Sequence, residues 1–190
     1  MARANDLGHD PIGRLVLRLA IPSMLAQLVN VLYSIVDRMY IGNIPVIGDA
    51  ALAGAGVCGP IVTLISSFAM LVGVGGGPLM AISMGAGDMA HAKKILANCA
   101  MMLAVLSLVL TGIMLAFREP MLMAFGASEA TFPYADEYLT VYVCGSLFAV
   151  LSVGLNQFII CQGFSGMGMA TVLIGAVLNI VLDPVFIFAL

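Results

Sequence analysis

Two aspartates lie in long apolar stretches of the chain, where they could bind a cation or a charged substrate. Asp183 follows Asn179 by four residues and directly precedes Pro184. Asp37 lies near the end of the first apolar stretch. A carboxylate costs about 2.5–3.5 kcal/mol at mid-membrane on insertion scales, so within a membrane it usually marks an ion or substrate path. For Asp37, an interfacial position paired with Arg38 is the alternative.

The residue pair Asp183–Pro184 also predicts a local irregularity. Proline lacks an N–H and disfavours helical geometry at the preceding residue, so the carbonyl of Ile180 would lose its partner. A free carbonyl beside Asn179 and Asp183 predicts a cation or proton site, with Pro184 as a candidate hinge. Broken backbone is not tolerated against lipid, so this face must look at protein or water.

Three predicted helices each carry a narrow stripe of polar and small side chains, at about 100° per residue. The first stripe contains Ser23, Gln27, Asn30, Ser34 and Asp37, bordered by Tyr33. The second contains Tyr138, Tyr142, Gly145, Ala149, Ser152 and Asn156. The third contains Thr171, Gly175, Asn179 and Asp183. Such residues commonly join helices to one another, but three stripes that include two acids favour a shared, water-filled cavity.

The elements that must position these stripes are membrane helices. The sequence is 62% hydrophobic and 9% charged, whereas soluble domains have roughly 25% charged residues. Apolar runs of about 20 residues recur along the chain, which predicts an all-α, polytopic membrane helix bundle. We expect this bundle in the plasma membrane or cell inner membrane. The net charge of −3, without a basic block, argues against a nucleic-acid partner.

We expect a polar cytoplasmic tail over residues 1–13 and a helical membrane region over residues 14–190. Five transmembrane helices are expected at about residues 15–40, 59–85, 95–117, 138–161 and 169–190. Glycines and a proline predict a loop before the second helix, and residues 118–137 are expected to hold a short interfacial turn. Arginines before the first helix and Lys93 and Lys94 after the second place the N-terminus in the cytoplasm.

Two motifs suggest enzymes only superficially. Residues 73–78 have the glycine content of a phosphate-binding loop but lack its preceding strand and its lysine. Residues 85–88 spell the Gly-x-Gly-Asp of membrane aspartyl proteases, which need two facing acids. Asp88 instead lies at a helix end beside His91. The four cysteines lie in apolar stretches and are interpreted as packing residues, and no His/Cys cluster predicts a metal site. We therefore expect no enzyme activity and no cofactor.

Several segments resemble the multidrug and toxic compound extrusion (MATE) family. Residues 179–188 resemble its fifth-helix signature, and Ile21-Pro22 with Tyr33 and Asp37 resemble its first helix. Residues 85–94 resemble the loop between its second and third helices. Asn156 resembles part of its fourth helix, and Gln162-Gly163 resemble the segment that follows that helix. The match follows the family's order and spacing along nearly the whole chain.

The resemblance implies export of cationic, amphipathic compounds in exchange for inward protons or sodium. It implies twelve helices in two six-helix lobes, so this chain corresponds to a partial N-terminal lobe whose partner would be the C-terminal lobe. Asp37 and Asp183 would be the coupling carboxylates, with sodium binding possible at both. The polar groups around them would be Asn30, Tyr33, Tyr138, Asn156 and Asn179.

Desolvation penalises the charged form of a carboxylate, so Asp37 or Asp183 could accept a proton near neutral pH. Protonation would weaken the hold on a bound cation and favour a rearrangement about Pro184. Two alternatives are a lipid-linked precursor flippase of the same superfamily and a non-transporting membrane scaffold. A flippase should have a strongly cationic cavity, whereas the three stripes contain no lysine or arginine.

Overall fold

The chain forms a bundle of long helices. The computed structural model describes residues 11–188. Within them the helices are α1 (Ile12–Gly42), α2 (Gly48–Gly85), α3 (Met89–Ala116), α4 (Arg118–Ala124), α5 (Phe132–Cys161) and α6 (Ser165–Phe188). All but the short α4 are long and apolar enough to cross a membrane, over five candidate spans. The prediction of an all-α, polytopic membrane bundle is confirmed.

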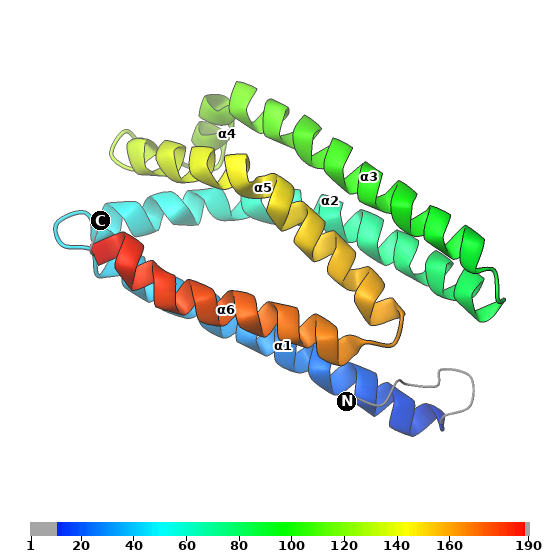
Figure 1. Cartoon of the computed structure of the whole chain (residues 1–190). Coiled ribbons are helices and arrows are strands. Elements are labelled where there is room, and N and C mark those ends of the chain that lie inside the picture. Colours follow the sequence, from blue (N-terminus) through cyan, green and yellow to red (C-terminus); the bar gives the residue numbers. More distant parts are fainter. Residues whose placement is uncertain (1–10, 189–190) are drawn as a thin grey trace.

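The helices pack in two groups. One is the α1–α6 pair, in which α1 packs chiefly against α6. The other is the α2–α3–α5 group, in which each helix contacts the other two. Helices α1, α3 and α6 run in one direction and α2 and α5 in the other (Figure 1). Since α1 and α6 run in the same direction, residues near their C-terminal ends lie toward the same end of the bundle.

The core lies within the α2–α3–α5 group. Its buried side chains include Ile61 and Ile65 of α2, Leu103 of α3 and Val143 of α5. On α2, glycine lets the helices approach closely, since a Cβ at Gly73 would lie 2.9 Å from the carbonyl oxygen of Gly154. This close contact fixes α2 against α5 and leaves the opposite faces of both helices available to line a cavity.

The second helix begins earlier than predicted. It starts at Gly48 rather than near Gly59, so the glycine-rich residues expected to form a loop are helical. One of them, Gly54, packs against α5, where a Cβ would lie 3.0 Å from the backbone nitrogen of Ala135. The glycine is thus explained by close helix packing rather than by a loop.

Two other helices also begin earlier in the sequence than predicted. The third helix begins at Met89 because Asp88 caps it, accepting a hydrogen bond from the backbone nitrogen of His91 at 2.9 Å. Lys93 and Lys94 therefore lie in its first turns rather than in a loop. The fourth predicted span extends back to Phe132 as α5, and α4 provides the short turn expected after the third. The predicted tail, residues 1–13, lies largely outside the described residues, as do residues 189 and 190.

Glycine in the left-handed region ends the predicted fourth span where the sequence indicated. Gly163 has φ +88°, and its nitrogen donates to the Ile160 carbonyl at 2.9 Å, while Phe164 donates to Ile159 at 3.2 Å. This pair of hydrogen bonds is the Schellman arrangement that closes helices. The chain then reverses within a few residues, and α6 begins at Ser165.

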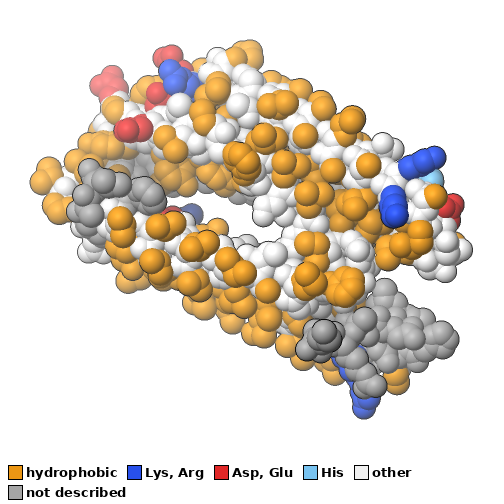
Figure 2. Space-filling view, viewed as in Figure 1, with side chains coloured by type: hydrophobic (Ala, Val, Ile, Leu, Met, Phe, Trp, Pro, Cys, Tyr) orange, Lys and Arg blue, Asp and Glu red, His pale blue; other side chains and the backbone are white. Residues whose placement is uncertain are grey.

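Charged side chains gather at the two ends of the bundle. Figure 2 shows lysine or arginine where α2 meets α3, and acidic side chains around α4 at the opposite end. Between them the surface is mostly apolar, as expected of a band that faces lipid. The view also shows a hollow between the α1–α6 pair and the α2–α3–α5 group.

Candidate functional site

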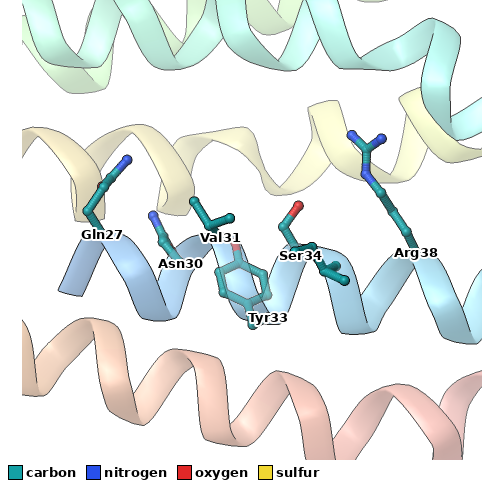
Figure 3. Close-up of a pocket in the computed structure, with 7 residues that line it drawn as sticks. Gln27, Asn30, Val31, Tyr33, Ser34 and Arg38 are labelled. Carbon is teal, nitrogen blue, oxygen red and sulfur yellow. The ribbon is translucent and has the colours of Figure 1, made fainter. Parts of the chain in front are cut away.

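The predicted stripe on α1 faces the hollow between the two helix groups. Gln27, Asn30, Ser34 and Arg38 point from α1 toward α5 and α2 (Figure 3). With Val31, Tyr33 and Ile35 they line a cavity of about 440 Å³. The four residues that point toward α5 and α2 are three or four positions apart, which places them on one side of an α-helix.

A larger cavity of about 760 Å³ joins α1 to the α2–α3–α5 group. From α1 it is lined by Asn30, Tyr33, Ser34 and Arg38, and from α2 by residues that include Thr63 and Ser66. From α5 it is lined by Tyr138, Tyr142, Ala149 and Val153. Sites for drug-sized ligands typically have about 300–1,000 Å³ and mix apolar walls with a few polar groups, so this cavity has the size and lining of such a site.

A third cavity of about 300 Å³ lies where α1, α5 and α6 meet. Asn30 and Tyr33 belong to it as well as to the larger cavity. Its other lining residues are Ser152, Val153, Asn156, Thr171, Val172, Gly175, Ala176 and Asn179. The polar stripes of α5 and α6 therefore share a cavity with the stripe of α1.

Neither aspartate belongs to the lining of these three cavities. Asp37 and Asp183 are both half-buried, and they are close enough to interact electrostatically. Tyr33 interacts electrostatically with both carboxylates. The helical period explains this arrangement, because Tyr33 and Asp37 are one turn apart on α1, rotated from Ser34 and Arg38. Asp37 of α1 and Asp183 of α6 therefore lie on neighbouring helices beside the cavities, and are called the acid pair below.

Unpartnered oxygen atoms lie on α6 and on α5, which borders it. Within the described part of the chain, Asn156 Oδ1, Asn179 Oδ1 and Asp183 Oδ2 are buried and accept no hydrogen bond. Buried polar atoms in native proteins are almost always satisfied, so orphan acceptors call for a ligand, a water or an ion. Each of the three atoms is an oxygen, the kind of atom that binds water or a hard cation.

The helix continues through Pro184. Helix α6 contains Pro184 and extends to Phe188, so the backbone irregularity predicted there does not end the helix. Helix α1 likewise continues past Pro22, and α2 past Pro60 and Pro78. The proposed role of Pro184 as a hinge stays a prediction.

One cationic side chain reaches the cavities. The predicted stripes contain no lysine or arginine, but Arg38, just beyond the predicted α1 stripe, lines two of the three cavities. It follows Ser34 by one helical turn, so the α1 stripe extends to residue 38. That period is the signal by which the sequence could have revealed it. The predicted stripe ends at Asp37, which the structure instead places toward α6.

The structure brings most of the predicted site residues together. Asn30, Tyr33, Tyr138, Asn156 and Asn179 line the cavities, while Asp37 and Asp183 lie next to them. Sequence reasoning placed Tyr142 on the α5 stripe without assigning it to the site, and did not include Ser66 or Thr63 of α2. The roles assigned to all of these residues stay predictions.

The family model MatE matches residues 22–185 of the chain. That match includes every described residue that lines the three cavities. The chain belongs to the MatE family. This confirms the family indicated by the first-helix, loop and fifth-helix segments of the sequence.

Relatives and solved structures agree with this membership. The chain is 27% identical over 190 residues to an FAD transporter of Shewanella oneidensis and spans 41% of its length. It is 27% identical over 182 residues to the multidrug export protein MepA of Staphylococcus haemolyticus, spanning 96% of this chain and 40% of MepA. The MATE multidrug transporter DinF-BH, solved in complex with rhodamine 6G, is 31% identical, with a TM-score of 0.90 over 100% of this chain and 42% of DinF-BH.

A MATE transporter solved in a bent conformation has a TM-score of 0.85 and 27% identity, covering 93% of this chain and 39% of that one. The relatives are transporters rather than enzymes. The MatE membership and the five apolar spans make the chain a multi-pass protein of the plasma membrane. The chain spans about two fifths of the length of these relatives.

Proposed function

We propose that this chain forms part of the N-terminal lobe of an antiporter that exports cationic or amphipathic small molecules in exchange for inward protons or sodium. The observation that carries the proposal is the acid pair Asp37–Asp183 next to cavities of substrate size. The C-terminal lobe would be its partner, and the protein would need no cofactor and perform no enzymatic catalysis.

The coupling step would take place at the α1–α6 junction. Two like charges close together in a poorly hydrated place repel each other, which favours taking up a proton or a cation. The buried, unpartnered oxygens of Asn179 and Asp183 would bind that cation. Sodium and a proton are both compatible with this set of oxygens.

Ion binding would then alter the substrate cavity through α1. Tyr33 interacts electrostatically with both acids and also lines all three cavities. A change in the charge of the acid pair would therefore change the field on Tyr33 and the packing of α1 against α6. In this scheme the ion and the substrate compete through the position of α1, and Pro184 lets α6 follow.

The two alternatives receive less support from the lining. A flippase for a lipid-linked pyrophosphate should present several cationic groups, whereas Arg38 is the one basic residue among the described lining residues of the three cavities. A membrane scaffold does not need buried, unpartnered oxygens, because such atoms destabilise the fold unless they bind a ligand.

Efflux from proteoliposomes tests the proposal. The complete gene product would be reconstituted, loaded with rhodamine 6G, the compound in the DinF-BH complex, and given either a proton or a sodium gradient alone. We expect one of the two gradients to accelerate dye efflux. In the Asp183→Asn variant that gradient should no longer accelerate efflux, although the protein still binds the dye. Asp88→Asn, which removes the charge of a helix cap far from the acid pair, is the matched control.

Two results would reject the proposal. One is efflux at the wild-type rate by the Asp183→Asn variant under the driving gradient. The other is efflux that ignores both gradients, since an antiporter cannot run uphill without its coupling ion.

A further inference from the structure

Arg38 is the charged side chain of the substrate cavities. It lines both the 440 Å³ cavity and the 760 Å³ cavity, whereas no acidic residue is among the described lining residues of either. Its guanidinium group points from α1 toward α2 and α5 (Figure 3). An arginine that only anchored α1 in the lipid headgroups would instead point outward, away from the space between the helix groups.

The guanidinium of Arg38 has donors to spare. Among residues 11–188 it makes no hydrogen bond or ion pair, although it interacts electrostatically with Asp37. Arg118, at the same end of the bundle, is in contrast held by Asp136 at 3.3 Å and Thr140 at 3.2 Å. A guanidinium carries five N–H donors in a planar fork that matches a carboxylate or a phosphate, so Arg38 is available to such a group.

An aromatic surface lines the same cavity. The rings of Tyr138 and Tyr142 are stacked, with centroids 6.4 Å apart and planes at 10° to each other. Flat aromatic substrates stack on such rings. The cavity therefore offers a place for a ring system on α5 and a place for an anionic group at Arg38 of α1.

We infer that Arg38 forms a subsite for the anionic group of an aromatic substrate, so that the cavity accepts zwitterionic or anionic amphiphiles and not only cations. The inference rests on the proposed export function and specifies the substrate class of the same cavity. The aromatic part lies against Tyr138 and Tyr142, and a carboxylate or phosphate of the same molecule pairs with the guanidinium. The acid pair of α1 and α6, rotated away from this face, remains free for the coupling ion.

A matched pair of dyes tests the subsite. Rhodamine 110 carries a free carboxylate, and rhodamine 123 is its methyl ester and therefore a cation. Binding of each to the complete gene product would be measured by fluorescence polarisation in nanodiscs of zwitterionic lipid. We expect Arg38→Gln to weaken rhodamine 110 binding about tenfold, which is typical of a lost charge-assisted hydrogen bond. Rhodamine 123 binding should stay unchanged or tighten.

Two further variants complete the design. Arg38→Lys keeps the charge but loses the planar fork, so it should restore part of the rhodamine 110 affinity. Arg14→Gln removes a positive charge at the opposite end of α1, outside the described cavity linings, and should leave the ratio of the two affinities at the wild-type value. The ratio is the decisive readout, because a folding defect would weaken both dyes together.

Three outcomes would overturn the inference. The first is that Arg38→Gln changes both affinities by the same factor. The second is that Arg14→Gln shifts the ratio as much as Arg38→Gln. The third is that adding phosphatidylglycerol to the nanodiscs lowers the rhodamine 110 affinity of the wild type to that of Arg38→Gln, because a lipid phosphate would then be the group that occupies Arg38. Failure of the proposed export function is a separate result, because it is measured by efflux from proteoliposomes and not by the ratio of the two dye affinities.

Discussion

The rings of Tyr138 and Tyr142 lie stacked one helical turn apart on α5, with centroids 6.4 Å apart, and both line the largest described cavity. Stacking each ring against its neighbour limits the freedom of both, so the surface offered to a ligand is already ordered before binding. An ordered aromatic surface beside polar groups suits flat, amphipathic molecules.

Replacing the ring at position 138 should weaken binding of such molecules. We expect Tyr138→Ala to reduce the affinity for rhodamine 6G roughly two- to thirtyfold, the range of aromatic–cation contacts of about 0.5–2 kcal/mol. Tyr138→Phe keeps the ring and should bind nearly as well as the wild type. Fluorescence polarisation on the complete protein measures both, and equal losses in the two variants would contradict a stacking role.

A buried hydroxyl pair should stabilise the contact between α3 and α5. Thr111 Oγ1 lies 3.0 Å from Ser146 Oγ, and the Ser146 side chain is fully buried. We expect Thr111→Val to lower the free energy of unfolding by about 1 kcal/mol, since it leaves Ser146 without this partner. Adding Ser146→Ala should recover part of the loss. Denaturant unfolding in detergent micelles measures the effect, and simple additivity of the two losses would count against a direct hydrogen bond.

The close approach of α2 and α5 depends on Gly73. A Cβ there would lie 2.9 Å from the Gly154 carbonyl oxygen and 2.9 Å from Cγ of Gln157. We expect Gly73→Ala to cost about 1–3 kcal/mol of stability, as overpacking does. Gly75→Ala is the matched control, because its Cβ would meet nothing within 4 Å, and alanine favours helix over glycine. Thermal unfolding that ranks Gly75→Ala below Gly73→Ala would refute this packing argument.

Gly168 should hold Asn156 in its place at the α1–α5–α6 cavity. The Asn156 side-chain nitrogen lies 3.5 Å from the Gly168 carbonyl, and a Cβ at residue 168 would lie 2.8 Å from Asn156 Oδ1. Gly168→Ala should therefore displace the Asn156 amide and weaken rhodamine 6G binding severalfold. Gly166→Ala should not weaken it, because the space around Gly166 is open.

A double variant separates positioning from folding at this site. In an Asn156→Ala background the clash with the amide is gone, so Gly168→Ala should weaken binding less than it does in the wild type. The cycle needs four binding curves by fluorescence polarisation. A full, additive loss in that background would show that Gly168 acts through Ile160 or the backbone instead.

Much of this architecture could be predicted from the sequence, because membrane helices have strong local signals. The length of the apolar stretches indicated the five spans. The rotation of about 100° per residue in an α-helix placed Asn30, Tyr138 and Asn156 on inward faces. The glycines at the start of α2 suggested a loop, but this segment is helical. Gly54 instead allows close contact with α5, a helix far away in the sequence. The pairing of α1 with α6 and the rotation that separates Asp37 from Arg38 depend on such distant contacts as well.

The division of the bundle into the α1–α6 pair and the α2–α3–α5 group has a mechanical consequence. The glycine-mediated contacts of α2 and α5 make that group a stiff wall, whereas α1 touches α2 far less than it touches α6. Tilting the pair as one body would alter the width of the hollow without breaking the interlocked helices. In such a tilt the α2–α3–α5 group would keep its internal contacts, and Asp37 and Asp183 would both travel with the α1–α6 pair.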